Sequence, residues 1–307
     1  MDEAFTLSHF SDLHWCCPDG IRVRELLNKR LFGYLKWRLH RHTGYRNEIL
    51  AALQQDLVSG HPDHTVITGD LTHLSRSEEF RRTAQWLRSL GPSRQVTVVP
   101  GNHDMYVKTV WENTFVHWAD YMASDDNLPG TAPGTPADAT YPVLRIRGPI
   151  AIIGVCSARP VNPLLAVGTI GKAQLRRLEQ ILLKTGRSQL LRVVLIHHPP
   201  VAGMVGWRKR LTDADHFRSV VRRCGAELIL HGHAHRSCHA RLETPGGEIP
   251  VIGVPAASAS DRKLQRRARY HLYRVRRNAT GWGIHMQAHT YSRDNGHFIP
   301  ETETSIR

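Results

Sequence analysis

The chain has 307 residues, of which 41% are hydrophobic, and this apolar content can bury the core of one large domain spanning 1–307. No apolar run approaches the roughly 18 residues of a membrane-spanning helix, and five scattered cysteines exclude a disulfide framework or a cysteine-based zinc site. Lys and Arg number 41 against 27 acidic residues, so the formal charge of +14 favours an anionic partner. The acidic N-terminus leads directly into a strand-like run, so we expect no signal peptide and a cytoplasmic protein.

Strand and helix patterns alternate along the first three quarters of the chain. In chain order we predict strand 5–10, helix 21–42, helix 46–58, strand 64–68, helix 76–90, strand 95–99, helix 108–122, strand 150–155, helix 172–184, strand 193–197, helix 214–223 and strand 226–230. The runs at 238–244, 249–254, 270–276 and 282–289 are typical of antiparallel strands. Most of the earlier strands are continuously apolar, which predicts an α/β fold whose sheets are covered on both faces. Residues 124–142, rich in Pro, Gly, Asp and Thr, predict a long surface loop.

The predicted helix at 21–42 is both basic and amphipathic. Its only acidic residue is Glu25, and its cations are Arg22, Arg24, Lys29, Arg30, Lys36, Arg38 and Arg41. On a helical wheel the apolar face consists of Val23, Leu26, Leu27, Leu31, Tyr34, Leu35 and Trp37. This pattern is typical of peripheral contact with an anionic membrane, here the inner membrane face. Two alternatives are a helix packed on the core with solvated cations and a helix that lines the substrate cleft. We do not expect a nucleic-acid partner, because no nucleic-acid module is present.

Five apolar runs end in side chains that can bind metal ions. In chain order these are Asp12 and His14, then Asp70 after Gly69, then Asn102 with His103 and Asp104, then His197 and His198, and finally His233 and His235. Each fragment alone is also typical of a strand end or a turn. All five in order, each directly after a strand-like run, are difficult to explain without a shared site. Because mixed imidazole and carboxylate ligands suit transition metals, we expect Mn, or alternatively Fe or Zn, rather than Mg or Ca.

The order D-x-H, G-D, G-N-H-D, H and G-H-x-H resembles the calcineurin-like metallophosphoesterase family over roughly residues 5–255. The resemblance implies a four-layer α/β/β/α sandwich of two mixed β-sheets. It also implies two divalent metal ions, one held by Asp12, His14, Asp70 and His235 and the other by Asp70, Asn102, His197 and His233. His103 is then placed near the leaving group and oriented by Asp104. We take His197 rather than His198 as the ligand, because the family's histidine is usually two residues before the first Pro.

The resemblance implies a dinuclear phosphoester hydrolase in which a metal-bridging hydroxide attacks phosphorus in line. The class III cyclic nucleotide phosphodiesterases and glycerophosphodiester phosphodiesterases share this motif plan, so a phosphodiester is the expected substrate. Neighbouring positions suggest His73, His198 and Arg236 as substrate contacts.

Two alternatives stay open. A membrane-associated pyrophosphohydrolase acting on a lipid-linked nucleotide sugar, such as UDP-diacylglucosamine in lipid A synthesis, would explain the basic apolar segment. The best-known enzymes of that type carry Arg where this chain has His103, which argues against it. A metal-binding scaffold without catalysis is the second alternative, although the matched ligand positions contain no gap.

Overall fold

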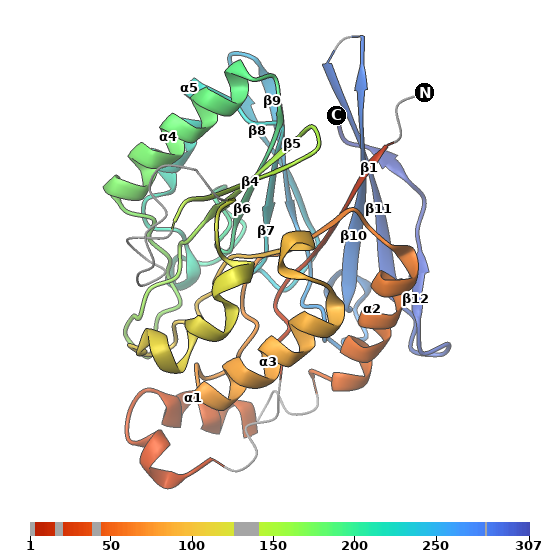
Figure 1. The fold of residues 1–307 in the computed structure, drawn as a ribbon. Coiled ribbons are helices and arrows are strands. Elements are labelled where there is room, and N and C mark those ends of the chain that lie inside the picture. Colours follow the sequence, from red (N-terminus) through yellow and green to blue (C-terminus); the bar gives the residue numbers. More distant parts are fainter. Residues whose placement is uncertain (1–3, 16–20, 39–43, 126–140, 280) are drawn as a thin grey trace.

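Two facing β-sheets with helices on their outer faces make up the computed structural model, which describes residues 4–15, 21–38, 44–125, 141–279 and 281–307 (Figure 1). The first sheet has the order β12-β11-β10-β1-β2-β3, and β13 also pairs with β11. Its strands are β1 (Phe5–Phe10), β2 (His64–Ile67), β3 (Val96–Val98), β10 (Arg269–Asn278), β11 (Gly281–Tyr291), β12 (Phe298–Pro300) and β13 (Thr304–Ser305). Strands β1, β2 and β3 are parallel to one another, whereas β10 runs antiparallel to β1.

The second sheet has the order β4-β5-β6-β7-β9-β8. Its strands are β4 (Val143–Arg147), β5 (Ile150–Val155), β6 (Leu191–Ile196), β7 (Leu228–His231), β8 (Cys238–Thr244) and β9 (Gly247–Gly253). The four central strands are parallel, and the edge strands β4 and β8 are antiparallel to their neighbours. Parallel strands need their faces covered by other elements, and the helices between them provide that cover.

Helices form the two outer layers. They are α2 (Asn47–Gly60) and α3 (Ser77–Leu90) on the first sheet, and α4 (Lys172–Arg187) and α5 (Ala214–Cys224) on the second (Figure 1). Single 3-10 turns occupy Val23–Leu26, Ser93–Gln95, Trp111–Asn113, Trp207–Lys209 and Leu264–Arg266, and a longer 3-10 helix occupies Phe115–Tyr121. Among the described residues, no helix combines the length and apolar character needed to cross a bilayer.

The side chains of β5 show why the molecule has four layers. Ile150 and Ile152 belong to the core cluster that also contains Val66 of the first sheet. The alternating residue Ile153 belongs to a second cluster, together with Leu178 of α4. Because successive side chains of a strand point to opposite faces, β5 is buried on both sides. The predicted four-layer α/β/β/α sandwich is therefore confirmed.

The predicted helix at 21–42 is not one continuous element. The described part contains the turn Val23–Leu26 and the short helix α1 (Arg30–Lys36), and residues 39–43 lie outside the described ranges. Tertiary contacts fix this segment. Arg30 donates hydrogen bonds to the backbone oxygens of Leu74 and Ser75, at 2.8 and 2.7 Å. A Cβ at Gly33 would lie 2.6 Å from the Leu74 side chain, so α1 packs closely there. The helical wheel could not anticipate either contact.

Other predicted elements differ in smaller ways. The helix predicted at 108–122 consists of 3-10 turns, and most of the loop predicted at 124–142 lies outside the described residues. Strand β4 was missed because Arg145 and Arg147 interrupt its apolar pattern. Arg145 is nevertheless buried. Its guanidinium donates hydrogen bonds to the backbone oxygens of four residues, namely Ala123, Ser93, Val96 and Asp120. A buried arginine is tolerated where its donors are satisfied in this way.

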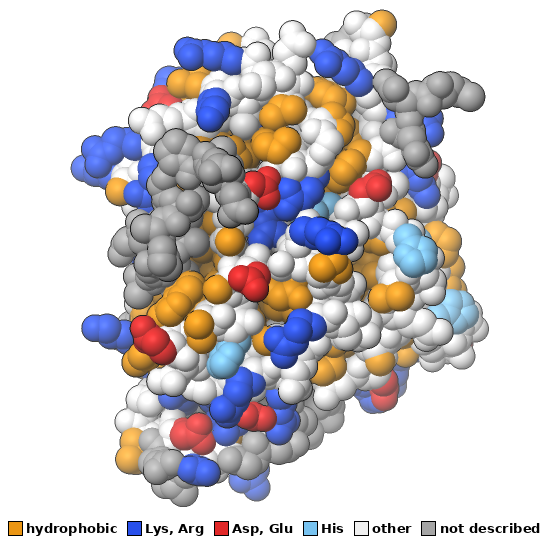
Figure 2. Space-filling view, viewed as in Figure 1, with side chains coloured by type: hydrophobic (Ala, Val, Ile, Leu, Met, Phe, Trp, Pro, Cys, Tyr) orange, Lys and Arg blue, Asp and Glu red, His pale blue; other side chains and the backbone are white. Residues whose placement is uncertain are grey.

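Basic side chains are spread across the face shown in Figure 2 rather than collected in one patch. On this face, the cations that contribute to the net charge of +14 are dispersed. Whether a particular surface binds an anionic partner depends on which apolar and acidic side chains lie beside its cations.

Leu178→Ala tests the outer layer of the second sheet. Leu178 is fully buried between α4 and this sheet, so the cavity should lower the free energy of unfolding by about 2–5 kcal/mol. Leu183→Ala on the same helix is the matched control. Leu183 is 42% exposed, and its loss should cost about 0.5 kcal/mol or less. Denaturant unfolding measures both, and equal losses would contradict the assigned packing.

Candidate metal centre

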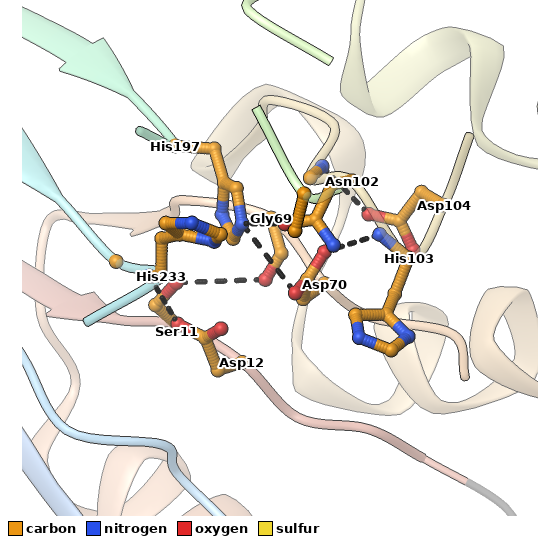
Figure 3. A network of polar contacts seen from close by, with 12 residues as sticks. Ser11, Asp12, Gly69, Asp70, Asn102, His103, Asp104, His197 and His233 are labelled. Atoms are coloured by element: carbon orange, nitrogen blue, oxygen red, sulfur yellow. Dashed lines mark hydrogen bonds and ion pairs between the residues drawn. The ribbon is translucent and has the colours of Figure 1, made fainter. Parts of the chain in front are cut away.

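The candidate ligands meet at the ends of three parallel strands of the first sheet and two parallel strands of the second. Asp12 follows β1, Asp70 follows β2 and Asn102 follows β3, so these three come from the first sheet. His197 follows β6 and His233 follows β7, both in the second sheet. Figure 3 shows these side chains directed toward one another between the two sheets. Open α/β sheets commonly build their sites at the carboxyl ends of strands.

The backbone at these strand ends is unusual. Five candidate ligands have a positive φ, namely Asp12 (56°), His14 (45°), Asp70 (55°), His233 (65°) and His235 (50°). Residues with a Cβ rarely adopt this left-handed conformation, which costs about 1–3 kcal/mol where it is strained. Such residues tend to cluster at functional sites, so the backbone marks this region independently of the motif letters.

Two glycines allow the strand ends to approach. A Cβ at Gly101 would overlap the Asp70 carboxylate, and a Cβ at Gly232 would overlap Ser11 and the Asp12 carboxylate. The loop after β3 therefore closes directly on Asp70, and the loop after β7 closes on Asp12. These glycines are needed for close approach rather than for a turn.

One group of potential ligand atoms belongs to Asp12, His14, Asp70 and His235, and these atoms all lie within 4.8 Å of one another. His235 Nε2 lies 3.0 Å from Asp12 Oδ1 and 3.4 Å from His14 Nε2. Two imidazole nitrogens that face each other at this distance need a proton or a cation between them. A divalent metal ion would satisfy both nitrogens and the carboxylates.

A second group consists of Asp70, His197 and His233. His197 Nε2 lies 3.4 Å from Asp70 Oδ2 and 3.2 Å from Asn102 Oδ1. Asn102 thus brings a neutral oxygen to the same place. Asp70 belongs to both groups and could be shared by two cations. These two groups contain residues that the resemblance implied for the two ions, and a third group of potential ligand atoms, from His14, His73 and His103, shares His14 with the first.

The burial of Asp70 is consistent with metal binding. Its Oδ1 accepts a hydrogen bond of 2.7 Å from the backbone N–H of His103. Its Oδ2 is buried and accepts no hydrogen bond from the described residues. A buried carboxylate oxygen is unfavourable without a compensating partner, and a bound cation would supply one.

Contacts behind the imidazoles select which nitrogen is available. His197 Nδ1 donates to the Thr68 backbone oxygen at 2.7 Å, which directs Nε2 to the centre. His233 Nε2 donates to the Lys209 backbone oxygen at 3.0 Å, which leaves Nδ1 for a ligand. The Tyr45 hydroxyl lies 2.9 Å from His235 Nδ1. Such contacts orient metal-binding histidines, and no motif in the sequence indicated Tyr45 or Lys209.

The electrostatics of the ligands are strongly coupled. Burial opposes ionisation of Asp70, but the neighbouring His197 and His103 hold its pKa well below the usual value. Burial also opposes the charged form of His197, yet the carboxylates of Asp70 and Asp12 raise its pKa to about 9. A metal ion that binds here would displace the proton of His197, so metal affinity and pH are linked.

His103 lies at the open side of the centre. Its Nδ1 donates a hydrogen bond of 2.7 Å to the backbone oxygen of His73, which fixes the ring. The prediction that Asp104 orients this ring is wrong. The Asp104 carboxylate instead accepts hydrogen bonds from the backbone N–H groups of Gly101 (2.9 Å) and Thr72 (2.8 Å). It therefore ties the loops after β2 and β3 together.

The three predicted substrate contacts have different positions. His73 lines the cleft beside His103, with ring centroids 5.3 Å apart. His198 is fully buried; its Nδ1 accepts from the Ser157 hydroxyl and its Nε2 donates to the Ala166 backbone oxygen. Facing the interior, it does not meet the expectation of a substrate contact. The guanidinium of Arg236 donates to the Met204 backbone oxygen and is absent from the described cleft lining.

A cleft of about 490 Å³ opens above the candidate ligands. It reaches Asp70, Asn102, His103, His233 and His235 at its base. Its walls also contain residues that the motifs did not indicate, namely Phe32, Gly33, Tyr106, Pro163, Leu164, Leu165, Ala166, Arg208 and Lys209. A cleft of this size suits a small organic ligand.

Comparisons with known proteins agree with this arrangement. A family model described as calcineurin-like phosphoesterase matches residues 5–237. A dimetal phosphatase from Danio rerio is similar in structure, with 14% sequence identity, a TM-score of 0.61, and coverage of 99% of this chain and 100% of that chain. A purple acid phosphatase from yellow lupin (Lupinus luteus) seeds has 12% identity and a TM-score of 0.56, and the match covers 99% of this chain and 54% of that one. No curated protein matches the chain.

Tyr45→Phe tests the contact behind His235. Without the hydroxyl, the His235 ring is less well oriented, and affinity for one of two metal ions should fall by about 10–100-fold. Calorimetric titration of the metal-free protein with Mn²⁺ measures this change. Tyr121→Phe is the control, because it removes a hydroxyl that donates to the Gly91 backbone oxygen instead. Unchanged binding in Tyr45→Phe would show that this hydroxyl does not support a ligand.

Proposed function

The chain belongs to the calcineurin-like phosphoesterase family, and we propose that it is a dinuclear metal-dependent phosphodiesterase. The family and the Asp/His cluster together indicate a site for two divalent metal ions. The observation that carries the proposal is the position of Asp70 in both groups of ligand atoms. A carboxylate with two oxygens can hold two cations at the short separation that phosphoester hydrolysis requires.

The proposed ligand roles follow the two groups. Asp12, His14, Asp70 and His235 would hold one cation, and Asp70, Asn102, His197 and His233 would hold the other. When bound, the two ions lower the pKa of a water molecule and neutralise charge on the phosphoryl oxygens. The protein contributes by fixing the ligands on strand ends, and by orienting their imidazoles through Thr68, Lys209 and Tyr45.

His103 is the proposed proton donor to the leaving group. Its Nδ1 is held by the His73 backbone oxygen, and the ring lines the cleft above Asp70. In the protonated imidazole, Nδ1 donates to this carbonyl oxygen, and the second proton, at Nε2, is available for the departing oxygen. General acid catalysis of this kind contributes about 10²–10⁴-fold in rate.

The cleft favours a diester over a monoester. Apolar wall residues, including Phe32, Leu164 and Leu165, stand beside the candidate metal ligands. A phosphodiester places an organic group on each side of phosphorus, and both groups need such surfaces. A monoester has an organic group on one side only, so it would leave part of this apolar surface without a contact.

For the metal we propose Mn, with Fe or Zn as alternatives. The donor set mixes imidazole nitrogens with carboxylate and amide oxygens, which suits borderline transition metals better than Mg or Ca. A non-catalytic scaffold is the competing function. The complete ligand set and the lined cleft favour an enzyme.

Hydrolysis of bis-p-nitrophenyl phosphate and p-nitrophenyl phosphate by the Mn²⁺-loaded protein tests the proposal. We expect the diester to be cleaved with the higher kcat/KM. Preference for the monoester would overturn the diester assignment. A loaded protein that cleaves neither compound would favour the scaffold.

Asp70→Asn should remove metal and activity together. The amide has one neutral oxygen where the carboxylate offers two charged ones, so it cannot serve both groups of ligands. Elemental analysis of the purified variant should show a large loss of bound metal, with circular dichroism unchanged. Asp63→Asn is the control, because that carboxylate accepts hydrogen bonds from Thr6 instead. A fully loaded, active Asp70→Asn variant would exclude the shared role.

His103→Ala should separate metal binding from turnover. The variant keeps the proposed ligands, so its metal content should match the wild type, while kcat falls by about 10²–10⁴-fold. A substrate with a more acidic leaving group should show a smaller loss, because that group needs less proton transfer. His216→Ala, which removes an exposed imidazole of α5, is the control. An equal loss for all leaving groups would contradict proton donation.

A further inference from the structure

Large apolar side chains are exposed around the mouth of the cleft. Phe32 (59% exposed) and Leu164 (74% exposed) line the cleft, and Trp207 (63% exposed) precedes the lining residue Arg208. Leu27, Leu31 and Leu35, which are 79%, 41% and 45% exposed, are on the same segment as Phe32. We call these six side chains the apolar rim. Exposed apolar groups concentrated beside a cleft indicate a binding surface.

The segments that carry the apolar rim are joined to one another. Lys29 Nζ donates a hydrogen bond of 3.0 Å to the Val161 backbone oxygen, which links the first segment to the loop bearing Leu164. The Ala166 backbone N–H donates to the Arg208 backbone oxygen at 2.8 Å, which links that loop to Trp207. In Figure 1, α1 lies at the end of the sandwich where the chain leaves β1. The three segments that carry the apolar rim are thus linked to one another at the site end of the molecule.

The charge around the apolar rim has one sign. Segments 21–38, 158–168 and 206–210 contain a single acidic residue, Glu25, whose carboxylate is paired with Arg76 at 3.2 Å. The third segment includes Arg208, Lys209 and Arg210 without an acid. Apolar side chains among cations are the composition that binds the interface of an anionic lipid layer. A second copy of this chain would present the same positive charge, so it is a poorer partner.

We propose that the apolar rim docks on an anionic lipid surface, and that the substrate is an acylated phosphodiester drawn from that surface. This inference rests on the proposed phosphodiesterase function and names its substrate class. The phosphodiester group lies over Asp70 and His103 at the base of the cleft. The acyl chain leaves between Phe32 and the Pro163–Leu165 wall, where it meets apolar side chains rather than water. The exposed rim then contacts the lipids from which the substrate comes.

Vesicle binding tests the docking surface without using activity. The metal-loaded protein should float with phosphatidylglycerol vesicles at low salt, be released by high salt, and stay unbound with phosphatidylcholine vesicles. The double variant Leu27→Ser/Leu35→Ser lacks two rim side chains outside the cleft lining. Its partition to phosphatidylglycerol vesicles should fall by about tenfold or more. Its hydrolysis of bis-p-nitrophenyl phosphate should be unchanged.

Leu183→Ser is the matched control, because Leu183 is 42% exposed on α4, in the outer layer of the second sheet. It should bind vesicles like the wild type. Absence of wild-type binding at every ionic strength would overturn the docking surface. Equal binding by the double variant and the wild type would also overturn it, since the charge alone would then explain the attraction.

Chain-length dependence tests the substrate class. With hexanoyl, decanoyl and tetradecanoyl lysophosphatidylglycerol below their micellar concentrations, kcat/KM should rise about tenfold or more along the series. Phe32→Ala and Leu164→Ala should flatten this rise. A flat series for the wild type would exclude an acyl-chain site.

The phosphodiesterase activity and the lipid-derived substrate can be contradicted by different results. Cleavage of bis-p-nitrophenyl phosphate without vesicle binding or chain-length dependence would overturn this inference and keep the phosphodiesterase. Vesicle binding by a loaded protein that cleaves no phosphoester would overturn the enzyme and the substrate class together, leaving only a lipid-binding surface.

Discussion

Asp70 is the residue on which the arrangement of the centre depends. Its carboxylate lies in both groups of potential metal ligands, and its Oδ1 also accepts the backbone N–H of His103. The residue has a φ of 55°, and the loop after β3 closes on it where Gly101 lacks a side chain. A single buried carboxylate therefore sets the position of both ligand groups and of the proposed proton donor. Its burial is tolerable only with cationic partners, which the family's dinuclear centre would provide.

The two-sheet architecture explains how ligands distant in sequence reach one place. Strands β1, β2 and β3 direct Asp12, Asp70 and Asn102 from the first sheet, and β6 and β7 direct His197 and His233 from the second. Buried side chains between the sheets make this frame rigid, so the strained strand ends are held by the core rather than by the ligands themselves. A rigid frame with strained ends is suited to a preorganised metal site.

The walls of the cleft determine what can reach the centre. The candidate ligands follow the motif order on which the family resemblance rests, whereas the segment containing α1 and the loop at 163–166 add apolar side chains to the cleft walls. Arg208 and Lys209 place cations on the same walls as the exposed side chains of Phe32 and Leu164. The candidate metal ligands and the walls of the cleft thus come from different parts of the chain.

The family, the four-layer fold and the candidate ligands could all be predicted from the amino-acid sequence, because each candidate ligand is adjacent to a strand whose pattern is local. Local patterns could not determine contacts made across the molecule. The hydroxyl of Tyr45 reaches His235, Asp104 binds backbone N–H groups rather than the His103 ring, and His198 faces the interior. The described part of the basic segment, 21–38, is divided into short elements and exposes Leu27, Leu31 and Leu35, since Arg30 and Gly33 pack against the loop at 74–75. These contacts and the shape of the basic segment became visible in the three-dimensional structure, because each depends on atoms that are distant in sequence and close in space.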